Sequence, residues 1–178
     1  MLRLFFALQP SLEQGTLLTA QVAPLAAQLG TRVVPAQNLH ATLCFIGALE
    51  PARLDALRAA AASLRGRPVR LTFDALEYWE TPKILCATAS GDSSAAAELA
   101  LALGEAAVAA GFAPDIKPFR AHLTLARKIS AAQAATVPWP LPLVSPMVMR
   151  ADTFVLMSSR REEAVSIYSA VDSWPLYD

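Results

Sequence analysis

The sequence has few residues that would build a metal site or a disulfide framework, and it has no excess of either charge. Its 178 residues include only two histidines and two cysteines. The cysteines, Cys44 and Cys86, lack the close spacing of a zinc site, so no metal and no cofactor are expected. Acidic and basic residues balance at 15 each, which argues against coating of a long nucleic acid through bulk charge.

Long apolar runs and two common active-site signatures are also missing. No segment approaches the roughly 20 apolar residues of a membrane span, and the run 2–8 is too short for a signal peptide. We therefore expect a cytoplasmic monomer without membrane contact. The sequence lacks the Gly-x-Ser-x-Gly elbow of serine hydrolases and the Gly-x-Gly-x-x-Gly turn of dinucleotide-binding proteins.

The composition, 54% hydrophobic and 17% charged, predicts one folded domain over residues 1–178. Apolar patterning predicts more strands than helices, and the two do not strictly alternate. This favours an α+β fold with largely antiparallel sheets.

A capping box at Ser11–Gln14 predicts a helix start. Predicted strands are 2–8, 39–46, 69–76, 84–89, 121–129, 147–157 and 164–171; predicted helices begin near 11, 51 and 94, with a proline-rich connection at 138–146 and a polar turn at 158–163.

The two histidines lie in two copies of one tetrapeptide, nearly half the chain apart. His40-Ala41-Thr42-Leu43 and His122-Leu123-Thr124-Leu125 both fit His-x-Thr-Leu, and both fall in predicted strands. Side chains two residues apart in a strand share a face. Each strand therefore presents an imidazole beside a hydroxyl, and two facing halves would bring four such groups into one cleft.

This set of groups suits hydrolysis of a cyclic phosphodiester. One neutral histidine removes a proton from water, and one protonated histidine gives a proton to the departing ribose oxygen. Threonine hydroxyls can donate to the phosphate oxygens as charge builds. Histidine fits both roles because its reference pKa is about 6.5, and the scheme requires no metal.

The two motifs and their contexts resemble the 2H phosphoesterase superfamily (HxTx motif). More closely, they resemble the RNA 2′,3′-cyclic phosphodiesterases once described as 2′-5′ RNA ligases. The resemblance runs over nearly the whole chain. Its segments are 3–8, 34–43 with 45–47, 82–85, 119–127, 154–160, Tyr168 and 174–176.

The resemblance implies a bilobal fold, with two pseudo-symmetric lobes of mainly antiparallel strands and flanking helices around a central cleft. It implies hydrolysis of a terminal RNA 2′,3′-cyclic phosphate, or of a nucleoside cyclic phosphate, to a 2′-phosphomonoester. By motif position His40 corresponds to the proton donor and His122 to the proton acceptor. Thr42 and Thr124 correspond to phosphate ligands.

The chain departs from the family pattern at three places. Ala121 stands where many members have proline before the second histidine. Lys83 and Cys86 flank the Ile84-Leu85 pair, where arginine and tryptophan are common. The closing turn, often glycine-containing, reads 161–163 as Arg-Glu-Glu. The missing tryptophan bears on base stacking, and Trp79 or Tyr78 could replace it or simply pack on the surface.

Several further residues have two interpretations. Phe5 either stacks on a base or ribose or packs in the core. Arg120, with Arg127 and Lys83, either contacts RNA phosphates or is solvated. Ser159 and Arg160 either match a family position near the cleft or form part of a turn. Strand alternation places Cys44 on the His40 face.

Other functions also remain open from the sequence. The same four groups could open an ADP-ribose cyclic phosphate, cleave 2′-5′ oligoadenylate or trim RNA. A non-catalytic RNA-end-binding module would not need an acid–base pair. An RNA ligase would need a nucleotidyl-transfer lysine motif, which is not evident in the sequence. Any ligation by this protein would therefore be a weak reversal of its cleavage reaction.

Overall fold

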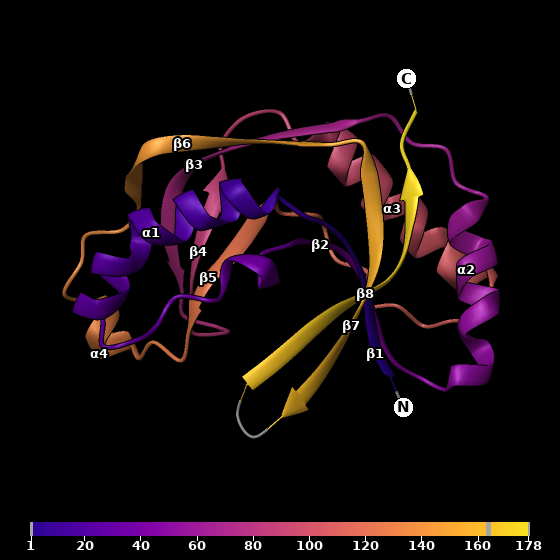
Figure 1. Cartoon of the computed structure of the whole chain (residues 1–178), viewed down its shortest axis with the longest axis horizontal. Coiled ribbons are helices and arrows are strands. Elements are labelled where there is room, and N and C mark those ends of the chain that lie inside the picture. Colours follow the sequence, from indigo (N-terminus) through magenta and orange to yellow (C-terminus); the bar gives the residue numbers. More distant parts are fainter. Residues whose placement is uncertain (1, 163–164, 178) are drawn as a thin grey trace.

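Two four-stranded antiparallel sheets form the centre of the molecule (Figure 1). The structure, a computed structural model, describes residues 2–162 and 165–177. The first sheet has the order β2-β1-β7-β8 and the second the order β5-β4-β3-β6. Every pairing within them is antiparallel. The predicted α+β class with mainly antiparallel sheets is confirmed.

The elements follow one another in the order of the labels in Figure 1. The strands are β1 (Leu2–Leu8), β2 (Ala41–Leu49), β3 (Val69–Trp79), β4 (Ile84–Ala89), β5 (His122–Arg127), β6 (Leu141–Ala151), β7 (Thr153–Glu162) and β8 (Val165–Pro175). The helices are α1 (Leu12–Gln28), α2 (Leu54–Ala62), α3 (Ser94–Ala109) and the short α4 (Ala131–Ala134), with single 3₁₀ turns at Ala36–Asn38 and Pro51–Arg53.

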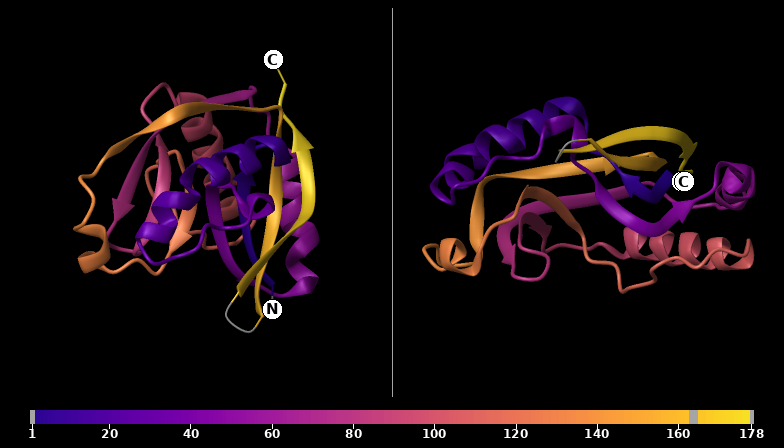
Figure 2. Two further views of the ribbon diagram at one scale, coloured as in Figure 1. Left: turned by 60° about the vertical axis from the view of Figure 1, so that its left-hand side comes forward. Right: turned by 90° about the horizontal axis from the view of Figure 1, so that it is seen from below.

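The helices cover the outer sides of the strands. Seen from below in Figure 2, α1 lies on one side of the strands and α3 on the other. A single large apolar cluster joins residues of both sheets and of α1, α2 and α3, including Phe6, Leu18, Leu57, Phe73 and Leu103. A smaller cluster, Phe5, Ala7 and Met157, lies apart from it on the other face of β1, since side chains alternate along a strand.

Local sequence signals explain where the helices begin and end. Ser11 caps α1: its hydroxyl accepts from the Gln14 N–H, and the Gln14 side chain accepts from the Ser11 N–H. This is the capping box that the sequence predicts. Gly30 follows the helix with φ +65°, a left-handed conformation that glycine adopts without steric cost.

The closing strand predicted at 164–171 is found as β8, but the one predicted before it is wrong. Residues 147–157 were expected to form one strand, but β6 ends at Ala151 and β7 begins at Thr153 in the other sheet. The proline-rich stretch is not only a connection, since Pro142 and Pro146 lie within β6. That position is compatible with proline because β6 is an edge strand. The expected polar turn from residue 158 is instead the second half of β7, and residue 163 lies outside the described residues.

Candidate active site

The two sheets place their histidine motifs at equivalent edges. His122 is the first residue of β5, and His40 immediately precedes β2; β5 and β2 are the edge strands of their sheets. The connection before His40 is bonded to β5, because the Val34 N–H donates to the Leu125 carbonyl at 2.7 Å. Reciprocally, the Asp115 N–H, in the connection before His122, donates to a carbonyl of β2 at 3.0 Å. These reciprocal bonds bring the two edges, and with them the histidines, together.

Both imidazoles are held in the same way. The Nδ1 atom of His40 lies 2.7 Å from the carbonyl oxygen of Asn38, and that of His122 lies 2.7 Å from the carbonyl oxygen of Arg120. A carbonyl can only accept, so Nδ1 carries the hydrogen in both rings. Nε2 is therefore a proton acceptor in the neutral ring and a proton donor in the charged ring. Each histidine is thus prepared for acid–base chemistry through Nε2.

Each tetrapeptide carries a β-bulge at its leucine. In the β1–β2 pair, Ala7 is opposite Thr42 and Phe6 is opposite Cys44, so Leu43 is the extra residue. In the β4–β5 pair the register skips Leu125 in the same way. A bulge reverses the alternation of faces beyond it. Cys44 therefore lies in the large core cluster and not on the His40 face, which corrects the prediction from strand alternation.

The second bulge has a consequence for Arg127. It lies five positions after His122, so a regular strand would place the two on opposite faces. Because Leu125 is an extra residue, Arg127 returns to the His122 face. Its positive charge lowers the pKa of both His40 and His122. Arg127 thus belongs to the site, which the sequence left undecided between an RNA phosphate contact and a solvated charge.

Aromatic rings surround His40. The ring centroid of Phe5 lies 4.8 Å from that of His40, and the ring of Tyr168 lies at 4.9 Å. Burial disfavours the imidazolium and is the main reason that the pKa of His40 falls to about 4. The charges of Arg127 and His122 lower it further, against the hydrogen bond to Asn38. Since His122 acts electrostatically on His40, the structure brings the two predicted histidines into one site.

A polar network surrounds His122 instead. The Trp79 ring lies 4.6 Å from the His122 ring, and the Arg120 guanidinium lies 4.5 Å from the Trp79 ring centroid. Burial is the main cause that lowers the pKa of His122, and the charges of Arg120 and Arg127 add to it. Of the two aromatic residues considered as substitutes for the missing tryptophan, Trp79 therefore lies at the site. Tyr78 does not, because its hydroxyl donates to the Ile129 carbonyl and its ring lies near Trp139.

Glu77 organises this network. Its carboxylate accepts from Trp79 Nε1 at 2.9 Å, from Arg120 Nη2 at 2.8 Å and from the Thr88 hydroxyl at 3.0 Å. Partial burial opposes ionisation, but these bonds and the Arg120 charge together hold the pKa of Glu77 below its ordinary value. Glu77 is directly opposite Cys86 in the β3–β4 pair, so a carboxylate network lies where the family commonly has tryptophan. No motif in the sequence indicated this role for Glu77.

The remaining predicted site residues lie on or next to the strands that carry the two histidines. Thr42 and Thr124 are half-buried, and their hydroxyls have no hydrogen-bond partner among the described residues. Phe5 is 3% exposed. Ser159 lies in β7 opposite Tyr168, so the alternative that it forms a turn is wrong. Arg120 is the exposed partner of Glu77.

Neither cysteine is suited to nucleophilic chemistry. Burial raises the pKa of Cys44 to about 11 and that of Cys86 to about 12, and the nucleophilic form of cysteine is the thiolate. Both thiols are free, as expected from their spacing.

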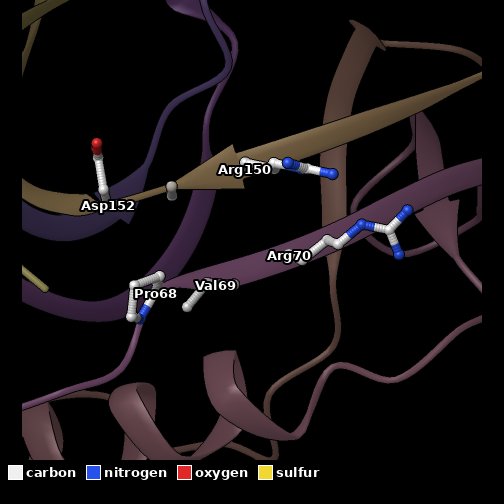
Figure 3. A pocket seen from close by; sticks show the side chains of 6 residues that line it. Pro68, Val69, Arg70, Arg150 and Asp152 are labelled. Carbon is white, nitrogen blue, oxygen red and sulfur yellow. The ribbon is translucent and has the colours of Figure 1, made fainter. Parts of the chain in front are cut away.

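Two hollows of the surface lie away from the histidine pair. One hollow, of about 310 Å³, lies between β3 and β6. Of the side chains that line it, Arg70 and Arg150 point in the same direction (Figure 3). A second hollow of about 280 Å³ lies between α1 and β6. Neither is lined by a histidine. Among residues 2–162 and 165–177 there is no cluster of three potential metal ligands, and no helix of that part is long and apolar enough to cross a membrane.

Comparison with known proteins agrees with this geometry. The family model described as LigT-like phosphoesterase matches residues 8–85. A curated Escherichia coli K12 protein, RNA 2′,3′-cyclic phosphodiesterase, is 30% identical over 139 residues, which are 78% of this chain and 77% of that protein. The crystal structure of E. coli LigT with 3′-AMP has a TM-score of 0.83 at 26% identity, over 99% of both chains. A structure from Thermus thermophilus shares the fold, with a TM-score of 0.75 at 23% identity over 98% of this chain and 97% of that one.

Two pseudo-equivalent sheets, each with a His-x-Thr-Leu motif at its edge, define a phosphoesterase of the 2H class. Within that class, the chain belongs to the LigT-like phosphoesterase family.

Proposed function

We propose that this phosphoesterase hydrolyses a terminal RNA 2′,3′-cyclic phosphate to a 2′-phosphomonoester, with residues 1–178 acting as one bilobal domain. The observation that carries the proposal is the matched pair of hydrogen bonds from His40 and His122 to backbone carbonyls. They direct both Nε2 atoms to proton transfer, and a symmetric pair of this kind has no evident use in binding alone. The name of the E. coli relative supports the choice of substrate.

In the proposed reaction, water attacks phosphorus and the bond from phosphorus to the ribose 3′ oxygen breaks. His122 Nε2 takes the proton from water, and protonated His40 gives its proton to the departing 3′ oxygen. The products are a 2′-phosphate and a 3′-hydroxyl. Thr42 and Thr124 donate to the non-bridging oxygens, and Arg127 stabilises their negative charge.

The lowered pKa of His40 places a condition on this scheme. With a pKa of about 4, His40 is neutral at neutral pH in the free protein, whereas a proton donor must be charged. A phosphate anion beside an imidazole favours the charged form. We propose that substrate binding itself raises the pKa of His40, so that His40 becomes protonated and can act as the general acid.

Residues at the border of the site are proposed to contact the nucleotide. Ser159 lies on the sheet of His40 and Arg120 lies beside His122, whereas Phe5, 3% exposed, packs against the His40 ring. The pairing of Arg120 with Glu77 leaves its other N–H groups available to a phosphate or a base, since guanidinium has five donors.

The test is hydrolysis of the four nucleoside 2′,3′-cyclic phosphates and of a short RNA with a cyclic phosphate end. The wild type, His40→Ala and His122→Ala proteins are compared, and 2′- and 3′-phosphate products are separated. A 2′-phosphate made by the wild type and lost in both variants is expected. Turnover that survives either substitution would exclude the two-histidine mechanism. No turnover by the wild type would move the assignment to another 2H substrate, such as an ADP-ribose cyclic phosphate, or to an RNA-end-binding module.

A further inference from the structure

Two lysines beside Arg127 adopt an unusual backbone conformation. Lys83 has φ +67° and Lys128 has φ +63°, and they are the only described residues other than glycine with positive φ. In this left-handed region the Cβ atom crowds the following carbonyl oxygen, and glycine or asparagine is the usual occupant. Stability alone would therefore not select lysine at either position.

The two lysines adjoin the last residue pair of one strand ladder. Ile84 is opposite Arg127 in the β4–β5 pair, and one step further the Ile129 N–H donates to the Lys83 carbonyl at 3.2 Å. Lys83 thus precedes one strand of this last pair, and Lys128 follows the other. Like charges that lie at the same end of a ladder repel each other.

No ion pair in the described part of the chain neutralises this concentration of positive charge. Lys83, Arg127 and Lys128 are exposed, and none has an ion-pair partner among residues 2–162 and 165–177. Glu80, in the same turn as Lys83, is not bonded to either lysine. Lys83 and Lys128 adjoin Arg127, whose charge acts on both histidines. A polyanion that runs from the catalytic pair toward this end of the sheet would neutralise them in turn.

We infer that Lys83 and Lys128 bind the phosphodiester backbone of the RNA strand that leads to the cyclic phosphate. This inference rests on the proposed function and adds to it the place where the RNA strand next to the cyclic phosphate binds. Phosphate contacts of this type position a strand without reading its sequence. The backbone strain at both lysines is then retained for binding, as strain at functional positions commonly is.

The test measures binding of a 2′-phosphate-ended RNA pentanucleotide and of a nucleoside 2′-monophosphate at several salt concentrations. The double variants are Lys83→Gln with Lys128→Gln, which removes the charges, and Lys83→Gly with Lys128→Gly, which also relieves the backbone. Arg150→Gln is the matched control, since Arg150 is an exposed cation of the same sheet without an ion-pair partner in the described residues. Wild-type turnover of nucleoside 2′,3′-cyclic phosphates is measured in parallel and tests the proposed function separately.

Both double variants are expected to bind the pentanucleotide about two- to fivefold more weakly for each lysine, the range of exposed ion pairs. The slope of log affinity against log salt should become shallower by about 0.7 for each phosphate that a lysine no longer neutralises. The glycine pair alone should also raise Tm, by about 1 to 4 °C for each site. This combination of weaker binding and higher stability is what a purely structural role of the lysines would not produce.

Three results would overturn the inference. One is a double variant with the affinity and salt slope of the wild type for the pentanucleotide. Another is an equal loss of affinity for the mononucleotide, which would show only a general effect on the catalytic pair. The last is a loss of affinity in Arg150→Gln equal to that in the double variants, which would show that RNA binding depends only on the overall charge of the protein. Each of these is compatible with wild-type hydrolysis of cyclic phosphates, so the proposed function would stand or fall independently.

Discussion

Replacing Glu77 by glutamine would remove a negative charge near His122 and leave room for every hydrogen bond around it. The carboxylate accepts from Trp79 and Arg120 through Oε2 and from Thr88 through Oε1. A glutamine amide can keep its oxygen toward Trp79 and Arg120. Its NH₂ group can then donate to the Thr88 hydroxyl, which reverses its own role from donor to acceptor. Glu77→Gln therefore isolates the effect of the charge.

The loss of stability follows from the kinds of bond that change. Hydrogen bonds to an ionised group contribute roughly 1.5 to 3 kcal/mol and neutral ones about 1 kcal/mol. The bond to Arg120 lies at the low end because the Arg120 side chain is 62% exposed. We expect Glu77→Gln to lower the free energy of unfolding by about 1 to 2 kcal/mol. For a chain of this size the corresponding fall in Tm is about 2 to 8 °C.

The lowered pKa of Glu77 determines how the stability difference between wild type and Glu77→Gln changes with pH. The pKa of Glu77 lies below its ordinary value of 4.5, so its contribution to stability is fully present above that value and is lost as pH falls through the lowered pKa. The difference between wild type and Glu77→Gln should be constant at neutral pH and shrink in acid. In the variant, the uncompensated Arg120 charge should also lower the pKa of His122 further. Chemical denaturation across pH and NMR titration of the two imidazoles measure both effects.

Thr88→Val is the control, because it removes one hydrogen bond from Glu77 and no charge. If Glu77→Gln and Thr88→Val lost equal stability at every pH, the charge would not be the source of the effect. An unchanged His122 titration in Glu77→Gln would show that the network supports only the fold and does not tune the histidine.

Three further predictions concern the catalytic pair. The profile of kcat/KM against pH should be bell-shaped and centred below about pH 6.5, because burial lowers the pKa of both histidines. A flat profile from about pH 5 to 9, with chemistry rate-limiting, would contradict the acid–base assignment. Arg127→Gln should raise the pKa of both imidazoles in an NMR titration. It should also lower kcat by about 10²-fold, the typical effect of losing one group that stabilises a charged transition state. Unchanged titrations would show that Arg127 does not act at the site. Full activity is expected after EDTA treatment, and a strict requirement for added metal would contradict the proposed mechanism.

The motif and its chemistry could be found in the sequence because they depend on local order. The two copies of His-x-Thr-Leu contain both histidines, and alternation predicts an imidazole and a hydroxyl on one face of each strand. The capping box at Ser11 is equally local, and it is confirmed. The acid and base roles of His40 and His122 stay predictions.

Features that depend on pairing between distant strands could not be read in this way. The division of the predicted strand 147–157 between two sheets depends on where β3 and β8 offer a partner, and both of its parts are apolar. The bulges at Leu43 and Leu125 are equally hidden, because a leucine there is buried with or without a bulge. The Glu77 network requires Arg120 and Trp79 to meet across the sheet, and none of the three has a motif spacing.

The bulges also explain how two like motifs acquire unlike surroundings. Each bulge turns the residue three positions after its threonine toward the histidine face: Arg127 in β5, and Phe45 in β2, where it packs with the cluster that contains Phe5. The same backbone irregularity thus delivers a cation beside His122 and an aromatic ring on the side of His40. Duplicated strands supply two equivalent imidazoles with the same tautomer. Their neighbours then make one site apolar and the other charged, which is the difference that an acid and a base acting on one phosphate require.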